Sequence, residues 1–95
     1  MININEFIKI CKSLTLKRRL KITKLLMQNK RGLIPLEISY ALKLPLATTV
    51  RNLMILRNAK VIRSFRVRNK MVYIFDIKII KKFGAIFKIL EKIQL

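Results

Sequence analysis

Histidine and tryptophan are absent from this 95-residue sequence, which also holds a single cysteine and only four acidic residues. A disulfide scaffold needs paired cysteines, and a zinc site needs three or four Cys or His ligands, so both are excluded. Acid–base and nucleophilic catalysis usually depends on His, on paired carboxylates or on a Cys beside a base. The sequence therefore argues against an enzyme, and we expect neither a metal nor a cofactor.

Long apolar runs are also missing. Lys and Arg interrupt every stretch before it approaches the ~18 consecutive apolar residues that a membrane-spanning helix needs. The first residues, from Met1 to Glu6, lack the basic start and the apolar run of a signal peptide. One unpaired cysteine fits a reducing compartment. We therefore expect a cytoplasmic protein, on the nucleoid or in the cytoplasm of a host cell.

Positive charge and apolar residues dominate the composition. Lys and Arg number 22, which gives a net charge of +18 and a pI near 11.2. This excess indicates a polyanionic partner, with nucleic acid first and an anionic membrane surface second. The apolar content of 53% argues against disorder and exceeds what one domain of residues 1–95 easily hides. It therefore indicates a self-association surface.

The first half of the chain has the apolar spacing of helices. Asn3 followed by Glu6 has capping-box spacing, which predicts a first helix over Ile4–Ser13. Thr15 is expected to cap a second helix, which should end near Gly32 after a cationic last turn.

Two further helices are expected around a tight turn. Pro35 suits the first turn of a short third helix that ends near Leu44. A longer helix is expected at about 45–58, with Leu53 and Leu56 as its clearest inward pair. A short and a longer helix joined in this way have helix-turn-helix spacing.

The apolar period then changes from 3.6 toward 2, which indicates strands. Residues 61–67 and 71–75 are rich in β-branched and aromatic residues and predict a hairpin, or wing, over about 61–75. Asn69 lies in its basic turn and tolerates the left-handed conformation that a tight turn needs. Asp76 is expected to cap a last helix at about 77–94, whose large apolar residues follow coiled-coil spacing.

Four segments resemble the ArsR-type winged-helix repressors. Leu14–Ile22 looks like the family's helix before the motif, with its Arg-Leu-x-Ile pattern, and Leu42–Leu53 is similar to its turn and recognition helix. Leu56–Ile62 resembles the exit into the wing, and Met71–Ile74 resembles the second wing strand. The resemblance extends from Phe7 to Asp76. The Ile-, Lys- and Asn-rich composition is also similar to that of small DNA-binding proteins of A/T-rich genomes, including archaeal viruses and plasmids.

The element order and this resemblance imply one fold class: mainly α with a small β-hairpin (α+β), a winged helix-turn-helix with N- and C-terminal dimerisation helices. The implied function is a homodimeric transcriptional regulator, most simply a repressor, that reads an inverted-repeat operator in double-stranded DNA. The sequence departs from the family at Pro45 and Leu46, where polar residues are usual, and at Lys60, where Gly is common. Metal-sensing members use Cys and His clusters, which this chain lacks.

Candidate site residues follow from the expected elements. Polar or small side chains near the start of the recognition helix should reach base edges: Ala47, Thr48, Arg51 and Asn52. The wing should lie along phosphates or enter the minor groove through Arg63, Arg66, Arg68, Asn69 and Lys70. Further phosphate contacts are expected from Lys17, Arg18, Lys21 and Lys43. The dimer interface is expected to contain Phe7, Ile10, Ile79, Phe83, Ile86, Leu90 and Ile93.

Several of these patterns have a second interpretation. Charges on exposed strands also discourage edge pairing, and the apolar residues of the last helix could close the monomer's own core. A charge of +18 also suits a DNA-coating protein without sequence preference. A membrane-surface or protein-interaction module is a further alternative, because the last helix is amphipathic and rich in lysine.

Overall fold

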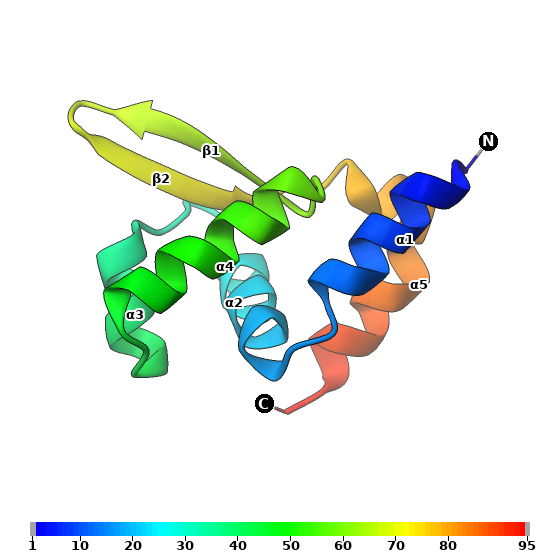
Figure 1. Ribbon diagram of the computed structural model, residues 1–95, viewed down its shortest axis with the longest axis horizontal. Coiled ribbons are helices and arrows are strands. Elements are labelled where there is room, and N and C mark those ends of the chain that lie inside the picture. Colours follow the sequence, from blue (N-terminus) through cyan, green and yellow to red (C-terminus); the bar gives the residue numbers. More distant parts are fainter. Residues whose placement is uncertain (1, 95) are drawn as a thin grey trace.

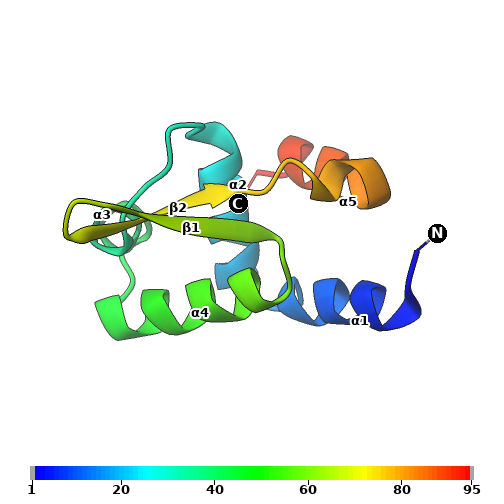
Figure 2. The ribbon, with the colours of Figure 1, turned by 90° about the horizontal axis from the view of Figure 1, so that it is seen from above.

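The computed structural model describes residues 2–94, which form five helices and one two-stranded antiparallel sheet (Figure 1). The elements in chain order are α1 (Ile4–Ser13), α2 (Lys17–Gln28), α3 (Pro35–Leu42), α4 (Leu46–Asn58), β1 (Ile62–Val67), β2 (Lys70–Phe75) and α5 (Ile79–Lys92). Figure 2 shows α4 and α1 along one side of the molecule and α5 on the opposite side. The predicted order of helices, hairpin and last helix is confirmed.

The first helix begins as its sequence predicts, whereas the second does not. The Asn3 side chain accepts hydrogen bonds from the backbone N–H groups of Asn5 (2.7 Å) and Glu6 (3.4 Å). The prediction that Thr15 caps α2 is wrong, because the N-cap residue is Leu16. The Thr15 hydroxyl instead donates to the Lys12 carbonyl (2.8 Å) at the end of α1.

The helix-turn-helix is formed by α3 and α4. Helix α3 ends at Leu42, two residues earlier than predicted, because Lys43 takes the left-handed conformation (φ 56°) that often terminates a helix. A buried hydrogen bond of 2.8 Å between the hydroxyls of Ser39 and Thr49 fixes the two helices to each other. Pro45 then begins α4 as its N-cap residue.

One hydrophobic core holds the elements together. Its most deeply buried side chains include Ile22 of α2, Ile38 of α3, and Leu53 and Leu56 of α4. The predicted inward pair of α4 is therefore confirmed. Phe87 of α5 closes the core against Phe75 of the hairpin, with the ring centroids 5.2 Å apart in an edge-to-face arrangement, a favoured geometry for aromatic pairs.

The hairpin has a two-residue turn, Arg68–Asn69, and its register pairs Ile62 with Phe75 and Val67 with Lys70. The left-handed residue of the turn is Arg68 (φ 57°) and not Asn69, as the sequence had suggested. The turn needs the left-handed conformation at its first residue, Arg68. Asn69 tolerates that conformation better than Arg68 does, but it is the second residue of the turn and does not adopt it.

Gly32 was predicted to end α2, but α2 ends at Gln28 and Gly32 lies against the hairpin. A Cβ atom on Gly32 would lie 2.6 Å from Val72 Cγ1 and 2.8 Å from the Tyr73 carbonyl oxygen, and its φ is +89°. The neighbouring Leu33 pairs with Tyr73 through backbone hydrogen bonds of 2.8 and 3.0 Å. Gly32 therefore allows the chain to approach β2 closely enough for this pairing.

We expect Gly32→Ala to lower the free energy of unfolding by about 2 kcal/mol, because it adds backbone strain and a steric clash. Thermal unfolding followed by circular dichroism should show a melting temperature about 10 °C lower. Gly84→Ala is the matched control, since its Cβ would meet only Ile80 Cγ2 at 3.5 Å. Equal melting temperatures for the two variants would contradict the role assigned to Gly32.

Helix α5 begins at Ile79, and Asp76 lies in the turn before it. The Asp76 carboxylate accepts a hydrogen bond from the Lys78 backbone N–H (3.0 Å), so Asp76 stabilises this turn and is not the cap that was predicted. At the other end of α5, Lys24 of α2 donates to the carbonyls of Leu90, Glu91 and Ile93. A cation is stabilising at the C-terminus of a helix, so Lys24 anchors α5 to the core.

Candidate nucleic-acid interface

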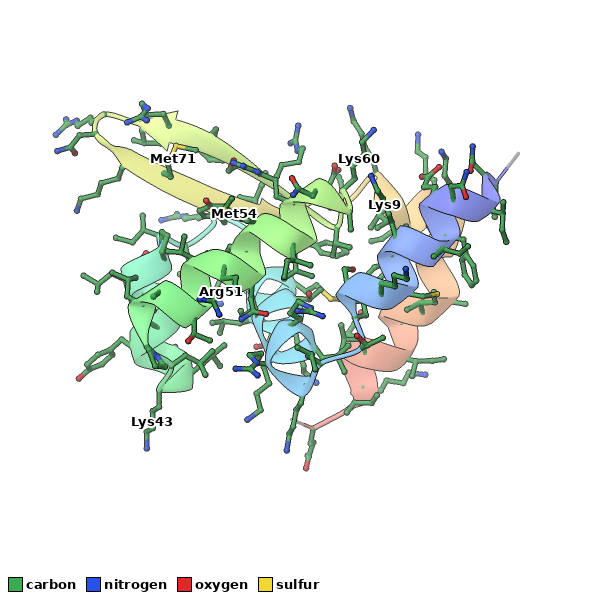
Figure 3. All side chains as sticks on the ribbon, viewed as in Figure 1. Lys9, Lys43, Arg51, Met54, Lys60 and Met71 are labelled. Carbon is green, nitrogen blue, oxygen red and sulfur yellow. The ribbon has the colours of Figure 1, made fainter. Side chains whose placement is uncertain are left out.

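The outward face of α4 is the centre of the candidate interface. Thr49, Leu53 and Leu56 point into the core, which leaves the opposite face exposed. Its side chains follow helical spacing of three and four residues: Ala47, Val50, Arg51 and Met54. In Figure 3, Arg51 and Met54 lie along α4, between Lys43 at the turn and Lys60 before the wing. Of the predicted readers, Ala47 and Arg51 are exposed and Thr48 is half-buried.

Asn52 was predicted to read a base, but the structure gives its side chain a different environment. It is 4% exposed, its Oδ1 atom accepts a hydrogen bond from Arg19 Nη1 (3.2 Å), and its Nδ2 atom donates to the Thr48 carbonyl (2.7 Å). It lies on the inward half of α4, four residues from the core residue Leu56. We therefore remove Asn52 from the candidate base readers and assign it to the buried contacts that position α4.

The predicted wing residues are all exposed at the hairpin. Arg66, Arg68, Asn69 and Lys70 gather at or next to the turn. Arg63 lies farther back, where its side chain is 57% exposed and its Nε atom is 4.0 Å from the Asp76 carboxylate. This weak ion pair leaves most of the positive charge of the wing unneutralised.

The wing is also connected to α4. Arg57 Nη1 donates a hydrogen bond of 3.3 Å to the Ser64 hydroxyl of β1. This contact joins the last turn of α4 to the first half of the hairpin. A binding partner that contacts α4 therefore also contacts the part of the hairpin nearest to α4.

The predicted phosphate contacts lie in two places, on α2 and in the turn before α4. Lys17 and Arg18 are exposed on α2, Lys21 is half-buried there, and Lys43 is exposed in the turn before α4. Lys43 lies next to α4, so it extends the positive surface of the recognition helix. Nothing in the structure joins Lys17 and Arg18 to the wing.

No acidic residue lies between Glu37 and Asp76 in the sequence. This stretch comprises the end of α3, all of α4 and both strands, and its only charged residues are Lys and Arg. The charges that α4 and the two strands carry are therefore all positive. Sequence reasoning considered the charges of each element separately and did not use this continuous run, although it is visible in the sequence.

The predicted dimer residues divide into two groups. Ile10, Ile79, Phe83 and Leu90 are at most 6% exposed, because they fill the monomer's own core and have little surface left for a partner. The coiled-coil spacing of α5 is also interrupted by a kink at Phe83. Phe7 and Ile93 remain exposed and Ile86 is half-buried.

A different apolar face of α1 is exposed. Ile4, Phe7, Ile8 and Cys11 lie along one side of the helix at spacings of three and four residues, and Ile4 is 68% exposed. Phe7 stacks on Phe83 of α5 at 5.7 Å between ring centroids, so this face adjoins α5. The sequence prediction included Phe7 but not Ile4 and Ile8, because it placed Ile10, which is buried, on the interface side of this helix.

None of the helices in residues 2–94 has both the length and the apolar content of a membrane span. Within the same residues, no group of three or more Cys, His, Asp or Glu side chains comes together as a set of metal ligands.

No protein-family model matches the chain, and no curated protein sequence matches it. Solved structures do resemble it. HlyU from Vibrio cholerae has a TM-score of 0.79 at 22% identity, over 95% of this chain and 92% of that chain. The transcriptional repressor PagR of Bacillus anthracis has a TM-score of 0.76 at 26% identity, over 92% and 94%.

A third similar structure is the homodimeric winged helix-turn-helix DNA-binding domain of a possible ArsR-family transcriptional regulator from Mycobacterium bovis. Its TM-score is 0.79 at 22% identity, over 92% of this chain and 79% of that chain. The chain therefore has the winged helix-turn-helix fold of ArsR-family regulators, and the predicted fold class is confirmed.

Proposed function

We propose that this protein is a homodimeric winged-helix DNA-binding protein that regulates transcription, most simply as a repressor that occludes a promoter. The observation that carries the proposal is the acid-free stretch between Glu37 and Asp76, which forms the recognition helix and the wing and exposes their cations on one side. The similar folds support it, since PagR is a transcriptional repressor and the Mycobacterium bovis domain is DNA-binding and homodimeric.

In the proposed complex, α4 enters the major groove, where Ala47, Thr48 and Arg51 face base edges and Lys43 approaches the backbone. The wing places Arg66, Arg68 and Lys70 along phosphates or in the minor groove. Two-fold symmetry presents two copies of α4 to half-sites about 34 Å apart. The operator is then an inverted repeat.

The test is fluorescence-anisotropy binding to duplexes from the gene's own upstream region and to scrambled duplexes, at a matched salt concentration. Specific regulators typically prefer their site by about 10³-fold or more. A preference of that size supports a sequence-specific regulator, and footprinting should then reveal an inverted repeat. Absence of binding to any duplex contradicts the proposal.

A DNA-coating protein without sequence preference is the second candidate. The observation in its favour is the outward face of α4, which carries the apolar side chains of Ala47, Val50 and Met54 beside Arg51. Such a face offers few hydrogen-bonding groups for reading bases. Both candidates lose affinity as salt rises, so salt does not separate them. Equal, tight binding to upstream and scrambled duplexes favours this second function.

The wing should contribute phosphate contacts that are independent of sequence. We expect the double change Arg66→Ala with Arg68→Asn to weaken binding to every duplex and to make the slope of log affinity against log salt less steep by about 1 to 2. Asn is chosen at position 68 because it tolerates the left-handed backbone there. Lys88→Ala, on the exposed side of α5, is the control and should leave the slope unchanged. An unchanged slope for the wing variant would remove the wing from the interface.

A further inference from the structure

The recognition helix exposes more apolar surface than a polar base reader needs. Val50 is 36% exposed and Met54 is 47% exposed, and Ala47 is exposed on the same face. These three residues, called the apolar stripe below, follow one another at helical spacing along α4. Arg51 lies beside them on this face.

The surroundings of the apolar stripe indicate what covers it. Its charged neighbours are cations: Lys43 precedes α4, Arg51 lies within the face, and Arg57 lies in the last turn. No acid occurs in this part of the chain. A surface that combines an apolar stripe with cations alone is complementary to a polyanion that carries apolar groups.

The major groove of DNA has one prominent apolar group, the C5-methyl of thymine. G·C pairs present only hydrogen-bonding atoms there, and a lone Arg can satisfy one guanine per recognition helix. An apolar side chain opposite a G·C pair therefore leaves groove atoms desolvated without partners, which costs affinity. Opposite a thymine, the same side chain buries a methyl group.

We propose that Ala47, Val50 and Met54 read thymine C5-methyl groups, so that the protein selects T-rich half-sites in which Arg51 contacts a single guanine. This inference rests on the proposed DNA-binding function and specifies its chemistry. Burial of one methyl group is worth about threefold to fourfold in an equilibrium constant. Two contacts in each of two half-sites should therefore give a preference of about a hundredfold.

The test compares two duplexes that differ only in methyl groups, so no operator need be known. One is an alternating dA–dT duplex, and the other has deoxyuridine at every thymidine. We expect the protein to bind the thymine duplex between tenfold and a hundredfold more tightly at the same salt concentration. A second pair tests the gain of a methyl: an alternating dG–dC duplex should bind more tightly when its cytosines carry a C5-methyl.

Two variants assign the effect to the stripe. The change Val50→Ala with Met54→Ala should lower the thymine-to-uracil ratio at least fivefold, with the remaining preference due to Ala47, while leaving affinity for the uracil duplex within about twofold. The matched control is Phe65→Ala, which removes another exposed apolar side chain from the wing and should keep the ratio. Both residues of the double variant are solvent-exposed, so unchanged circular dichroism is expected.

The outcomes separate this inference from the proposed function. Tight, equal binding to the thymine and uracil duplexes overturns methyl reading but leaves DNA binding intact. Absence of binding to either duplex contradicts DNA binding, and the inference falls with it. A thymine preference that is undiminished in the Val50 and Met54 variant also overturns the inference, because another part of the protein must then read the methyl.

Discussion

Replacing Arg19 with methionine should destabilise the fold and also weaken DNA binding. Arg19 is 9% exposed, and its guanidinium donates three hydrogen bonds: Nε to the Ser13 carbonyl (2.7 Å), Nη2 to the Lys12 carbonyl (3.3 Å) and Nη1 to Asn52 Oδ1 (3.2 Å). The first two acceptors end α1, and the third belongs to α4. Arg19 therefore connects the N-terminal helix to the recognition helix.

The expected loss of stability follows from the environment of the Arg19 guanidinium. None of its three hydrogen-bond acceptors is a carboxylate, so its charge is stabilised by the carbonyl end of α1 and by the Asn52 amide. Arg19→Met keeps much of the side-chain volume but removes the donor from the Ser13 carbonyl and from Asn52 Oδ1, whereas the Lys12 carbonyl keeps the Thr15 hydroxyl. We expect a loss of about 3 kcal/mol in the free energy of unfolding, since hydrogen bonds to charged groups are the strong ones. Chemical denaturation of the variant and the wild type measures it.

A double-mutant cycle isolates the link to α4. Arg19→Met and Asn52→Leu should each destabilise, and the double variant should lose about 1 to 2 kcal/mol less than their sum, because the two residues are in contact. Arg18→Met is the control, since Arg18 is an exposed neighbour on α2 and should change stability little. Additive losses from the cycle would show that Arg19 and Asn52 act independently.

The same cycle separates the two interpretations of Asn52. A base reader affects discrimination at one position of the site, whereas a residue that orients α4 affects every duplex alike. We expect Asn52→Leu to weaken binding to matched and mismatched duplexes by the same factor. A change at a single base position would return Asn52 to the readers.

The fold was predictable because each element has a strong local signal. The Asn3 cap, Pro35 and the change of apolar period before Ile62 mark element ends without help from the rest of the chain. The errors have two causes, a tertiary contact at Gly32 and a competing local hydrogen bond at Thr15. Gly32 looked like a helix stop, but close approach to β2 is what requires it, and the Thr15 hydroxyl was already engaged by α1.

The candidate site was less predictable because it depends on helix rotation. Arg51 and Asn52 are adjacent, both polar and both typical base readers, yet Arg51 is exposed and Asn52 is buried. Only the buried neighbours Thr49, Leu53 and Leu56 fix which side faces outward. The same difficulty affected α5. Its apolar residues have the spacing of a coiled-coil dimer interface, but they pack into the monomer's own core.

Introducing a charge on the exposed face of α1 should separate the proposed dimer into folded monomers. Ile8 is 42% exposed and lies in the apolar row with Ile4, Phe7 and Cys11. Burial against a second copy desolvates this row, and a carboxylate there would then lack a partner. We expect Ile8→Glu to sediment as a monomer with an unchanged circular dichroism spectrum. Phe83 and Leu90 are unsuitable for this test, because they are core residues and a charge there would destabilise the fold.

The loss of dimerisation should appear in DNA binding only where two half-sites are present. Linking two binding modules raises affinity by about 10²–10⁴-fold through effective concentration. Ile8→Glu should therefore lose at least about a hundredfold on an inverted-repeat duplex but bind a single half-site as the wild type does. Tyr40→Glu is the control for charge, because Tyr40 is 89% exposed on α3, and it should remain dimeric.

Cys11 lies in the same apolar row of α1 as Ile8. Its thiol should therefore react more slowly with an alkylating reagent in the wild type than in Ile8→Glu. Equal rates would place the dimer interface elsewhere.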